Sequence, residues 1–501
     1  MVTFDVSSAS PAKVSADLLI VPFLEGGKPG PGFDVVAEAL DTDLRRVLRD
    51  NQVTGRPGDS FPIPALGRIS ARNILLVGVG PRGEAGPGLV RQAIQRVAGR
   101  VSRFARVATT LPQLGDDPEE SAHAFAEGLL LGAYRFDRYK QQPLDDASKK
   151  QSRLAKATVL AERRVAGPMK AGLERGRIYA EATNWARDLV NAPALDATPD
   201  FLAREAKNMA ALGGLGCKIW TKSMLEKAGF GGVLGVAAGS ANEPRLIELT
   251  YRGGANGPTI AITGKGITFD SGGLSIKPAD GMETMKDDMG GAAAALAAMH
   301  GVARLKPNVN VIAAIPSAEN MPGGSAIRPG DVLRHYGGKT SEVLNTDAEG
   351  RLILADALAY LAEKKPAAII DAATLTGAAM VALGNDLWAV IGSDRDLIQG
   401  LLDAGASEGE PGWELPLWTD YRRKIESSIA DVKNIGDRWG GAITAALFLK
   451  EFVGDVPWAH IDVAGPAFVS AAERDWPRGA TGSPARTLIR YIERYAPNGG
   501  P

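Results

Sequence analysis

Cysteine and histidine are both scarce in this chain of 501 residues. Cys217 is the single cysteine, so no disulfide can form within the chain, which fits a reducing compartment. The histidines are His123, His300, His335 and His460, and no two of them have the His-x-x-x-His spacing of helical zinc sites. This scarcity argues against histidine-based metallopeptidases and against serine or cysteine triads, with His460 left open as a base. Any hydrolysis would have to rely on carboxylates and lysines.

Long apolar runs and an excess of charge of one sign are also lacking. No apolar stretch reaches the roughly 18 residues that a membrane helix needs, and the alanine-rich stretch Ala292–Ala298 is far shorter. The first residues, Met1 to Val6, have neither the basic start nor the apolar core of a secretory signal. A net charge of −1 produces no global field toward nucleic acid or a membrane. We therefore expect a cytoplasmic protein without membrane association.

The first part of the chain has the pattern of a small α/β unit. Buried strands are predicted at Asp17–Phe23, Asn73–Gly78 and Ala157–Ala161, and helical spacing of apolar residues occurs over Leu89–Val107 and Ser121–Tyr139. The polar stretch Gln141–Ser152 is typical of a loop or boundary, and Lys170–Leu189 is typical of a long helix. Because 501 residues exceed one ordinary core, we expect an N-terminal α/β domain over residues 1–165 and a linking helix over residues 166–190.

Strands and helices alternate in the second part, which predicts a largely parallel sheet. The strand candidates are Arg245–Tyr251, Thr259–Thr263, Asn308–Ile315 and Ala367–Ala372. The helix candidates are Gly291–Val302, Arg351–Glu363 and Gly441–Phe452. The fold class is therefore α/β, with a larger C-terminal domain over residues 191–501 built on a mainly parallel central sheet.

One octapeptide, Asn345–Leu352, concentrates charged groups at short spacing. A strand would place Asp347, Glu349 and Arg351 on one face, and a loop would let them converge as well. Carboxylates held close together suit hard divalent cations. A single metal would not need the arginine, whereas a reacting carbonyl or an anion beside the metal would. An ion pair between Arg351 and either carboxylate is the alternative.

A second block lies upstream, after the strand predicted at Thr259–Thr263. The segment Gly264–Gly273 carries Lys265 and Asp270, and Lys277 and Asp288 follow. Open α/β sheets place their sites at the carboxyl ends of strands, so these four side chains are expected to face Asp347 and Glu349. Asp287, beside Asp288, is expected to be exposed and without a role.

Together these blocks resemble the leucyl aminopeptidase family, also called the cytosol aminopeptidase family, whose two-metal enzymes remove N-terminal residues from peptides. The octapeptide matches the family signature without a departure, and the Gly-Lys-Gly…Phe-Asp-Ser-Gly-Gly…Lys and Asp-Met-Gly-Gly blocks match in order and spacing. The resemblance extends from about Asp188 to Ala467 and more loosely beyond. It implies a metal-dependent aminopeptidase acting on peptides and amino-acid amides with leucine-like ends. It also implies a homohexamer, a catalytic role for residues 191–501, and an oligomer or regulatory role for residues 1–165.

The resemblance also implies two zinc or manganese ions and the residues that hold them. By that resemblance Asp270 and Glu349 bridge the ions, Asp347 adds to one, and Asp288 and Lys265 add to the other. A lysine binds a metal only as a neutral amine, so its pKa must fall well below about 10.4, as a nearby dication would cause. Without the resemblance, Lys265 would be interpreted as a surface lysine after a strand.

Further roles follow from the same resemblance. Lys277 would stabilise the oxyanion of a tetrahedral intermediate, and Arg351 would hold a bicarbonate ion that takes and returns a proton of the bridging water. Asp288 would also meet the substrate's free α-amine. The residues implied for substrate binding are Met285, Asn345, Thr374, Leu375, Gly377 and Ala464. Without the resemblance, Met285 and Ala464 would be interpreted as core residues.

Two other patterns point elsewhere. Gly78–Gly83 spells the dinucleotide motif after a strand, but no Asp or Glu occurs from Ala85 to Gly115 to hold a ribose, and Pro81 removes an N–H donor. Arg96, Arg100 and Arg103 have helical spacing, which allows nucleic-acid binding by the first domain, although a solvated or subunit-facing stripe is the favoured interpretation. A two-metal phosphatase would use similar carboxylates but usually needs histidines that this site lacks.

Overall fold

The computed structural model describes residues 2–81, 86–140, 154–254, 257–471 and 476–495. The chain forms two compact units, one built from Met1–Glu181 and the other from Ala182–Ala472 together with the segment from Pro477 onward. The predicted loop at Gln141–Ser152 and residues 82 and 83 of the glycine pattern lie outside the described residues. The long helix predicted at Lys170–Leu189 is present as α5 (Ala166–Asn191).

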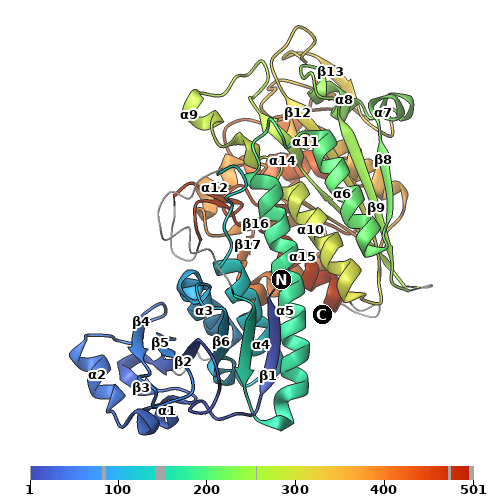
Figure 1. Cartoon of the computed structure of the whole chain (residues 1–501). Coiled ribbons are helices and arrows are strands. Elements are labelled where there is room, and N and C mark those ends of the chain that lie inside the picture. The colour runs from blue at the N-terminus through green and yellow to red at the C-terminus, as the bar shows by residue number, and fades with distance from the viewer. Residues whose placement is uncertain (1, 82–85, 141–153, 255–256, 472–475, 496–501) are drawn as a thin grey trace. The chain divides into compact units, whose positions relative to one another are not determined.

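The first unit is built on a mixed sheet with the strand order β1-β7-β6-β2-β5-β4 (Figure 1). Neighbours are parallel except β4, which is antiparallel to β5, and the short β3, which is antiparallel to β2. The strands are β1 (Thr3–Ser7), β2 (Leu18–Leu24), β3 (Lys28–Pro29), β4 (Ser60–Pro64), β5 (Asn73–Gly78), β6 (Arg106–Thr109) and β7 (Lys156–Leu160). The helices are α1 (Phe33–Leu40), α2 (Leu44–Asp50), α3 (Pro87–Val101) and α4 (Pro118–Gly132).

Strand β2 is buried along its whole length because both faces of this sheet are covered. Leu18 and Ile20 pack with residues of α3 and α4, whereas Leu19 and Val21 pack with residues of α1 and α2. Because side chains alternate along a strand, β2 contributes residues to a separate hydrophobic cluster on each face of the sheet. The predicted helix over Leu89–Val107 was too long, since α3 ends at Val101 and a strand, β6, begins five residues later.

The second unit contains the larger sheet, with the order β17-β16-β19-β15-β10-β12-β9-β8 and β11 paired to β12. Its centre, β19-β15-β10-β12, is parallel, and antiparallel pairs flank it, which confirms the predicted fold class. The strands are β8 (Gly216–Trp220), β9 (Arg245–Arg252), β10 (Thr259–Gly264), β11 (Gly266–Asp270), β12 (Asn310–Asn320), β15 (Ala368–Ala373), β16 (Trp388–Gly392), β17 (Gly412–Glu414) and β19 (Trp458–Asp462). Smaller ribbons are β13 (Val332–Arg334), β14 (Thr340–Glu342), β18 (Val432–Lys433), β20 (Phe468–Val469) and β21 (Gly479–Ala480).

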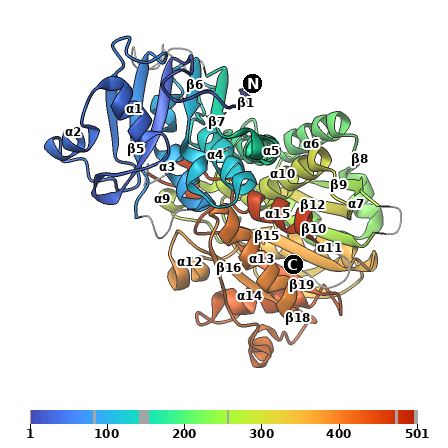
Figure 2. The ribbon, with the colours of Figure 1, turned by 90° about the horizontal axis from the view of Figure 1, so that it is seen from below.

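Helices cover both faces of this sheet (Figure 2). The first layer is α6 (Pro199–Gly213), α10 (Gly290–Leu305), α13 (Arg395–Glu408) and α15 (Ala485–Arg494). The second layer is α8 (Gly231–Ala237), α11 (Gly350–Glu363) and α14 (Gly441–Lys450), and short helices α7 (Lys222–Ala228), α9 (Ala279–Met282) and α12 (Gly377–Leu383) lie in the connections. Glycine and alanine let α10 approach the sheet closely, since a Cβ at Gly291 would lie 1.9 Å from the carbonyl oxygen of Ala372.

The parallel centre of the sheet positions the site, because the carboxyl ends of its strands share one edge. Lys265 follows β10, Thr374 follows β15, and Ala464 follows soon after β19. Glu349 caps the N-terminus of α11, the helix that leads back along the sheet. None of the described helices is both long and apolar enough to cross a membrane.

Candidate metal centre

Lys265 lies at the centre of a buried cluster of charges. Lys265 is 4% exposed, and its Nζ lies 2.7 Å from Asp288 Oδ1 and 2.8 Å from Glu349 Oε1. Nζ also donates a hydrogen bond of 3.1 Å to the carbonyl of Thr374. The interpretation of Lys265 as a surface lysine is therefore wrong.

Gly350 makes room for that lysine. Glu349 is the N-cap of α11, and Gly350 is the first residue of the helix. A Cβ built on Gly350 would lie 2.5 Å from Lys265 Cε and 2.8 Å from its Nζ, closer than real contacts allow. Gly350 lies in regular helix, so no unusual backbone angle requires a glycine here. The glycine is needed because the Lys265 side chain occupies the space that a Cβ would fill.

Asp270 and Lys277 form the neighbouring part of the cluster. Asp270 ends β11, and its Oδ1 accepts hydrogen bonds of 2.8 Å from both the Gly272 N–H and Asn320 Nδ2. Its Oδ2 lies 3.0 Å from Lys277 Nζ, which in turn lies 2.5 Å from Asp347 Oδ1. The second block and the octapeptide thus meet as predicted, through pairs of opposite charge.

Several carboxylate oxygens in this cluster are buried without a hydrogen bond. They are Asp288 Oδ2, Asp347 Oδ1 and both oxygens of Glu349, although the Lys277 ammonium lies 2.5 Å from Asp347 Oδ1 and the Lys265 ammonium lies 2.8 Å from Glu349 Oε1. Asp270, Asp288 and Glu349 each offer an oxygen within 4.8 Å of the others. Buried oxygens without donors are costly in a protein interior, and a compact set of them matches the coordination that divalent cations prefer. The residues present therefore fit a metal centre.

Burial and mutual charge shift the titration of these groups. Burial raises the pKa values of the Asp288, Asp347 and Glu349 carboxyls above their usual range. Burial alone would lower the pKa of Lys265, but the charges of Asp288 and Glu349 outweigh it and raise that pKa. A metal-binding lysine must give up its proton, which a dication beside it favours. Metal binding here is therefore expected to release protons.

The octapeptide is a loop that runs into a helix, so the loop alternative for its geometry is the one realised. Asn345 Oδ1 accepts a hydrogen bond of 2.8 Å from the Asp347 N–H, which closes a local turn. Thr346 Oγ1 donates to the Gly272 carbonyl at 2.7 Å and accepts from the Ser275 N–H at 2.8 Å. These bonds fix the octapeptide against the segment that carries Asp270 and Lys277.

Arg351 is buried in the first turn of α11 and has no carboxylate partner in the described part of the chain. Its Nη1 donates to the carbonyl of Asn434 at 2.8 Å, and its Nε is buried without a partner. Burial lowers the pKa of this guanidinium to about 10. The alternative of an ion pair with Asp347 or Glu349 is therefore wrong, and a buried guanidinium with a free donor suits an anion.

Asn434 is a structural centre of the site that sequence reasoning missed. Its Oδ1 accepts from the Leu344 N–H at 2.9 Å and the Asn345 N–H at 3.3 Å. Its Nδ2 donates to the carbonyls of Asn345 at 2.7 Å and Ala348 at 3.3 Å. The residue therefore holds the backbone of the octapeptide and, through its own carbonyl, Arg351. It follows the two-residue strand β18 and carries no motif, so only the long-range contact identifies it.

Asp462, also missed by sequence reasoning, organises the region predicted to bind substrate. Its carboxylate accepts from the Leu375 N–H at 3.2 Å, Thr376 Oγ1 at 2.7 Å and the Ala464 N–H at 3.1 Å. Thr374 belongs directly to the cluster, since its Oγ1 donates to Asp288 Oδ1 at 2.8 Å. The ends of β15 and β19 are thereby held together beside the charged cluster.

The other residues predicted to bind substrate lie nearby in the chain. Met285 begins the short helix η5 (Met285–Asp287), three residues before Asp288, and Gly377 is exposed at the start of α12. Met285 and Ala464 are half-buried, so the alternative that they are core residues is wrong.

His335 forms a serine–histidine–aspartate arrangement that has no access to substrate. Its Nε2 lies 2.7 Å from Ser341 Oγ, and its Nδ1 lies 3.1 Å from Asp356 Oδ1. These distances match a hydrolytic triad, but all three side chains are buried within the second unit. The arrangement ties β14 to α11 and explains nothing about catalysis. His460 is likewise buried, and its Nδ1 lies 2.6 Å from Asp371 Oδ1.

Asp287 is half-buried, so the expectation that it is exposed was wrong. Burial raises its pKa from an ordinary 3.8 to about 7. A carboxyl whose pKa is raised by folding stabilises the fold while protonated and penalises it once ionised. We expect Asp287→Asn in metal-free protein to raise Tm by about 1–3 °C at pH 8. The gain should shrink as pH falls through 7 and vanish below about 4, and an equal gain at pH 4 and pH 8 would contradict it.

The arginines of the first unit do not form one helical stripe. Arg103 and Arg106 lie beyond the end of α3. Arg96 donates to the carbonyl of Pro57 at 2.5 Å, and Arg100 donates to Ser60 Oγ at 3.0 Å, so both also bind their own domain. Nucleic-acid binding by this unit stays an untested prediction.

The fold and the buried cluster define a two-domain α/β protein with a metal-binding centre. The catalytic-domain model of the cytosol aminopeptidase family matches residues 184–489, and the N-terminal-domain model of that family matches residues 20–143. The chain therefore belongs to the cytosol aminopeptidase family. It is an aminopeptidase, a metal-binding hydrolase, and the resemblance stated from its motifs is confirmed.

Relatives match along nearly the whole chain. A probable cytosol aminopeptidase of Streptomyces griseus subsp. griseus is 43% identical over 513 residues, which cover 99% of each chain. One from Geobacter sp. strain M21 is 43% identical over 495 residues, covering 98% of this chain and 99% of its own.

Solved structures agree with the fold. The bottromycin maturation enzyme BotP in complex with Mn is 36% identical, with a TM-score of 0.85 over 96% of this chain and 99% of its own. A mutant of tomato leucine aminopeptidase is 31% identical, with a TM-score of 0.87 over 99% of this chain and 97% of its own. These two relatives bear names of different activities, so the family alone does not define the substrate of this chain.

Proposed function

We propose that this protein removes leucine-like N-terminal residues from peptides and amino-acid amides. The observation that carries the proposal is the buried cluster in which Asp270, Asp288 and Glu349 offer oxygens within 4.8 Å of one another around Lys265. Carboxylates without hydrogen-bond donors, beside an amine, are a ligand set for hydrolytic metals. The family match and the manganese named with BotP support this choice.

Two divalent ions, manganese or zinc, are proposed at this cluster. Their proposed ligands are Lys265, Asp270, Asp288, Asp347 and Glu349, with Asp270 and Glu349 shared. When bound, such ions activate a water molecule and polarise the scissile carbonyl. The chain itself must keep the ligands dry and fixed, which Asn320 does for Asp270 with a 2.8 Å hydrogen bond.

Lys277 and Asp288 are proposed to act on the substrate as well. The Lys277 ammonium is less buried than Lys265 and would stabilise the negative oxygen that develops on the attacked carbonyl. Asp288 would accept a hydrogen bond from the free α-amine, which selects unblocked peptide ends. Thr374 fixes the orientation of that carboxylate through its 2.8 Å hydrogen bond.

Arg351 is proposed to hold bicarbonate, which would accept and return a proton of the attacking water. The support is its buried guanidinium with an unpaired Nε. Asn434 positions this arginine through the 2.8 Å bond to its carbonyl. The side-chain pocket is proposed to be lined by Met285, Thr374, Gly377 and Ala464, with Asn345 and Leu375 contacting the peptide backbone. Small and apolar walls suit leucine.

We also propose the division of the chain that the sequence suggested. Residues 191–501 perform catalysis, residues 166–190 link the parts, and residues 1–165 serve assembly or regulation. A homohexamer in the cytoplasm is proposed with it, and light scattering is the test of assembly. Nucleic-acid binding by the first domain is the second candidate function. A gel shift over a salt series without binding at low salt would remove it.

Chelation tests the proposed chemistry most directly. Removing divalent metal is expected to abolish hydrolysis of a leucine anilide, and adding manganese or zinc back is expected to restore it, because the ligands are part of the fold. A phosphate monoester serves as the comparison substrate for the two-metal phosphatase alternative. Full peptidase activity in metal-free protein, or faster cleavage of the phosphate ester, would contradict the proposal.

Replacing Asn434 tests whether it positions the reacting groups. Asn434→Leu removes four hydrogen bonds, three to the octapeptide and one to Leu344 just before it, and we expect kcat to fall by about 10–100-fold, as for outer-shell partners of metal ligands. Asn434→Asp keeps the acceptors and loses the donors, so it should show a smaller loss. A purely structural role would instead lower Tm and leave kcat per folded molecule unchanged.

A further inference from the structure

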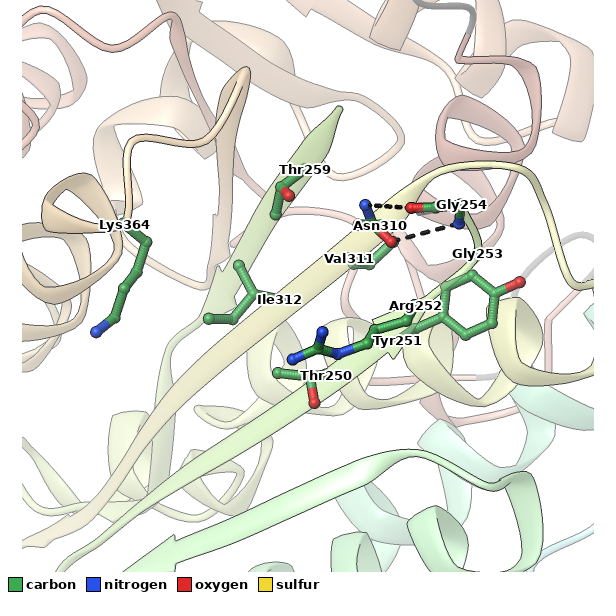
Figure 3. Close-up of a pocket in the computed structure, with 10 residues that line it drawn as sticks. All are labelled: Thr250, Tyr251, Arg252, Gly253, Gly254, Thr259, Asn310, Val311, Ile312 and Lys364. Carbon is green, nitrogen blue, oxygen red and sulfur yellow. Dashed lines mark hydrogen bonds between the residues drawn. The ribbon is translucent and has the colours of Figure 1, made fainter. Parts of the chain in front are cut away.

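A second hollow lies at the opposite edge of the catalytic sheet, where β10 and β12 begin and β9 ends. It encloses about 440 Å³ and is lined by the strand residues Thr250, Arg252, Thr259, Asn310 and Ile312 and by Lys364 of the α11 C-cap (Figure 3). Two of the proposed metal ligands, Lys265 and Glu349, lie at the other ends of β10 and α11, so this hollow is a different place on the same unit.

Strand register explains why these side chains share one face. In the antiparallel pair of β9 and β12, Thr250 lies opposite Ile312 and Arg252 lies opposite Asn310. In the parallel pair of β10 and β12, Thr259 lies beside Asn310. Partners in register point to the same side of a sheet. Because α11 ends at Glu363, it leaves the beginnings of these strands uncovered.

The hollow carries a positive charge, and no acidic residue in its lining neutralises that charge. Arg252 and Lys364 are exposed, no carboxylate belongs to the lining, and neither cation has an ion-pair partner in the described part of the chain. Figure 3 shows Ile312 between the two cationic side chains, so they flank an apolar floor. A lysine at a helix C-terminus is favoured by the helix dipole, but a strand arginine without a partner has no such explanation.

Glu248, a carboxylate on this face of β9, already accepts hydrogen bonds from other side chains. Glu248 lies two residues before Thr250 on the same face, and its Oε2 accepts from Trp220 Nε1 at 3.0 Å and from Tyr360 Oη at 2.7 Å. Tyr360 also holds the cation, since Lys364 Nζ lies 4.5 Å from the centre of its ring. Tyr360 thus contacts Glu248 through its hydroxyl and Lys364 through its ring.

The wall beside Arg252 is held in shape by Asn310. Its Nδ2 donates to the carbonyls of Gly254 at 2.9 Å and Gly257 at 3.0 Å, and its Oδ1 accepts from the Gly254 N–H at 3.4 Å. On the other face, Tyr251 Oη donates to the Pro307 carbonyl at 3.0 Å. The asparagine amide is therefore used by the fold, and the groups left for a ligand are the two cations and the threonine hydroxyls.

We propose that this hollow binds a small ligand that carries a phosphate group. A guanidinium binds phosphate oxygens in pairs, an ammonium adds a point charge, and Thr250 and Thr259 supply hydroxyl donors. The volume of about 440 Å³ exceeds a bare phosphate and falls in the range of small-molecule sites. Ile312 provides an apolar surface for the rest of such a molecule.

Calorimetry on the metal-loaded enzyme tests the proposal with inorganic phosphate and AMP as probes at constant ionic strength. Saturable binding with Kd below about 10 mM is expected. Arg252→Glu should weaken it at least about 10-fold, because it replaces a charge-assisted donor by a repelling charge. Lys218→Glu is the matched control, an exposed cation on the same sheet face outside the lining, and should change Kd less than about 2-fold.

Two further comparisons complete the test. One distinguishes a phosphorylated molecule from free phosphate as the ligand, and the other tests whether binding occurs at the proposed reaction site instead. Tighter binding of AMP than of phosphate identifies a phosphorylated molecule as the ligand, and equal binding identifies free phosphate. Arg351→Ala should leave the measured binding intact, because that arginine belongs to the proposed reaction site. No saturable binding, binding that Arg252→Glu and Lys364→Glu both leave unchanged, or loss on Arg351→Ala alone would overturn the proposal. Arg252→Glu is expected to hydrolyse leucine anilide normally, so failure here is independent of the peptidase proposal.

Discussion

Glu349→Ala is expected to lower kcat for leucine anilide by at least about 10³-fold, the largest effect of any single change proposed for this protein. Both oxygens of this side chain are buried, and Oε1 lies 2.8 Å from the ammonium of Lys265, another proposed metal ligand. Their proposed role is to be shared between two ions, and alanine removes that sharing outright. Metal analysis of the purified variant should show less bound metal than the wild type.

Glu363→Ala is the matched control for this experiment. It changes the same residue type at the other end of α11, where the carboxylate is exposed and accepts a hydrogen bond from Tyr336 Oη. We expect its kcat and metal content to stay within about 2-fold of wild type, as for exposed polar contacts. Wild-type activity and metal content in Glu349→Ala would contradict the proposed ligand set.

Lys277→Met is expected to lower kcat by about 10²–10³-fold with little change in KM, which is the effect of losing an oxyanion donor. Methionine keeps the length and apolar packing of the lysine and removes its charge. The ammonium now lies 3.0 Å from Asp270 Oδ2 and 2.5 Å from Asp347 Oδ1. Because two proposed metal ligands also lose a counter-charge, metal content must be measured beside the rate.

Added metal separates the two possible origins of that loss. If Lys277 stabilises the reacting oxygen, saturating manganese or zinc restores metal content but not kcat. If it only holds Asp270 and Asp347 in place, saturating metal restores both, and the catalytic role is wrong. Lys424→Met provides the control, since that lysine pairs with Asp437 at 2.9 Å and contacts none of the proposed ligands.

Sequence reasoning located the site residues that belong to short sequence motifs. Lys265 and Asp270 lie five residues apart at the two ends of the short strand β11, and Asp347 and Glu349 lie in one loop, so a motif keeps them together in any chain that carries it. The strand at Thr259–Thr263 and the helix at Arg351–Glu363 were also predictable, because buried apolar runs and helical periodicity extend over their lengths.

What the sequence did not reveal depends on contacts between distant segments. Asn434 reaches the octapeptide across about 90 residues and Asp462 reaches Thr376 across 86, and neither has a pattern around it. The helix over Leu89–Val107 was drawn too long because Val101, Phe104 and Val107 continue a helical spacing. Pairing of β6 with β2 and β7 overrides that local preference. Asp287 was misjudged because the three-residue helix η5 is too short for the burial of its residues to leave a periodic pattern.

Helix propensity favours alanine at Gly350, whereas the position of the Lys265 side chain favours glycine. Alanine is the better residue in a helix by roughly 0.5–1 kcal/mol, and only the flexible end of Lys265 stands in its way. That end is the ammonium 2.7 Å from Asp288 and 2.8 Å from Glu349, and displacing it from these buried carboxylates would cost about 3–5 kcal/mol. Engineers who stabilise enzymes of this type by filling helices with alanine would therefore lose both melting temperature and turnover at this position.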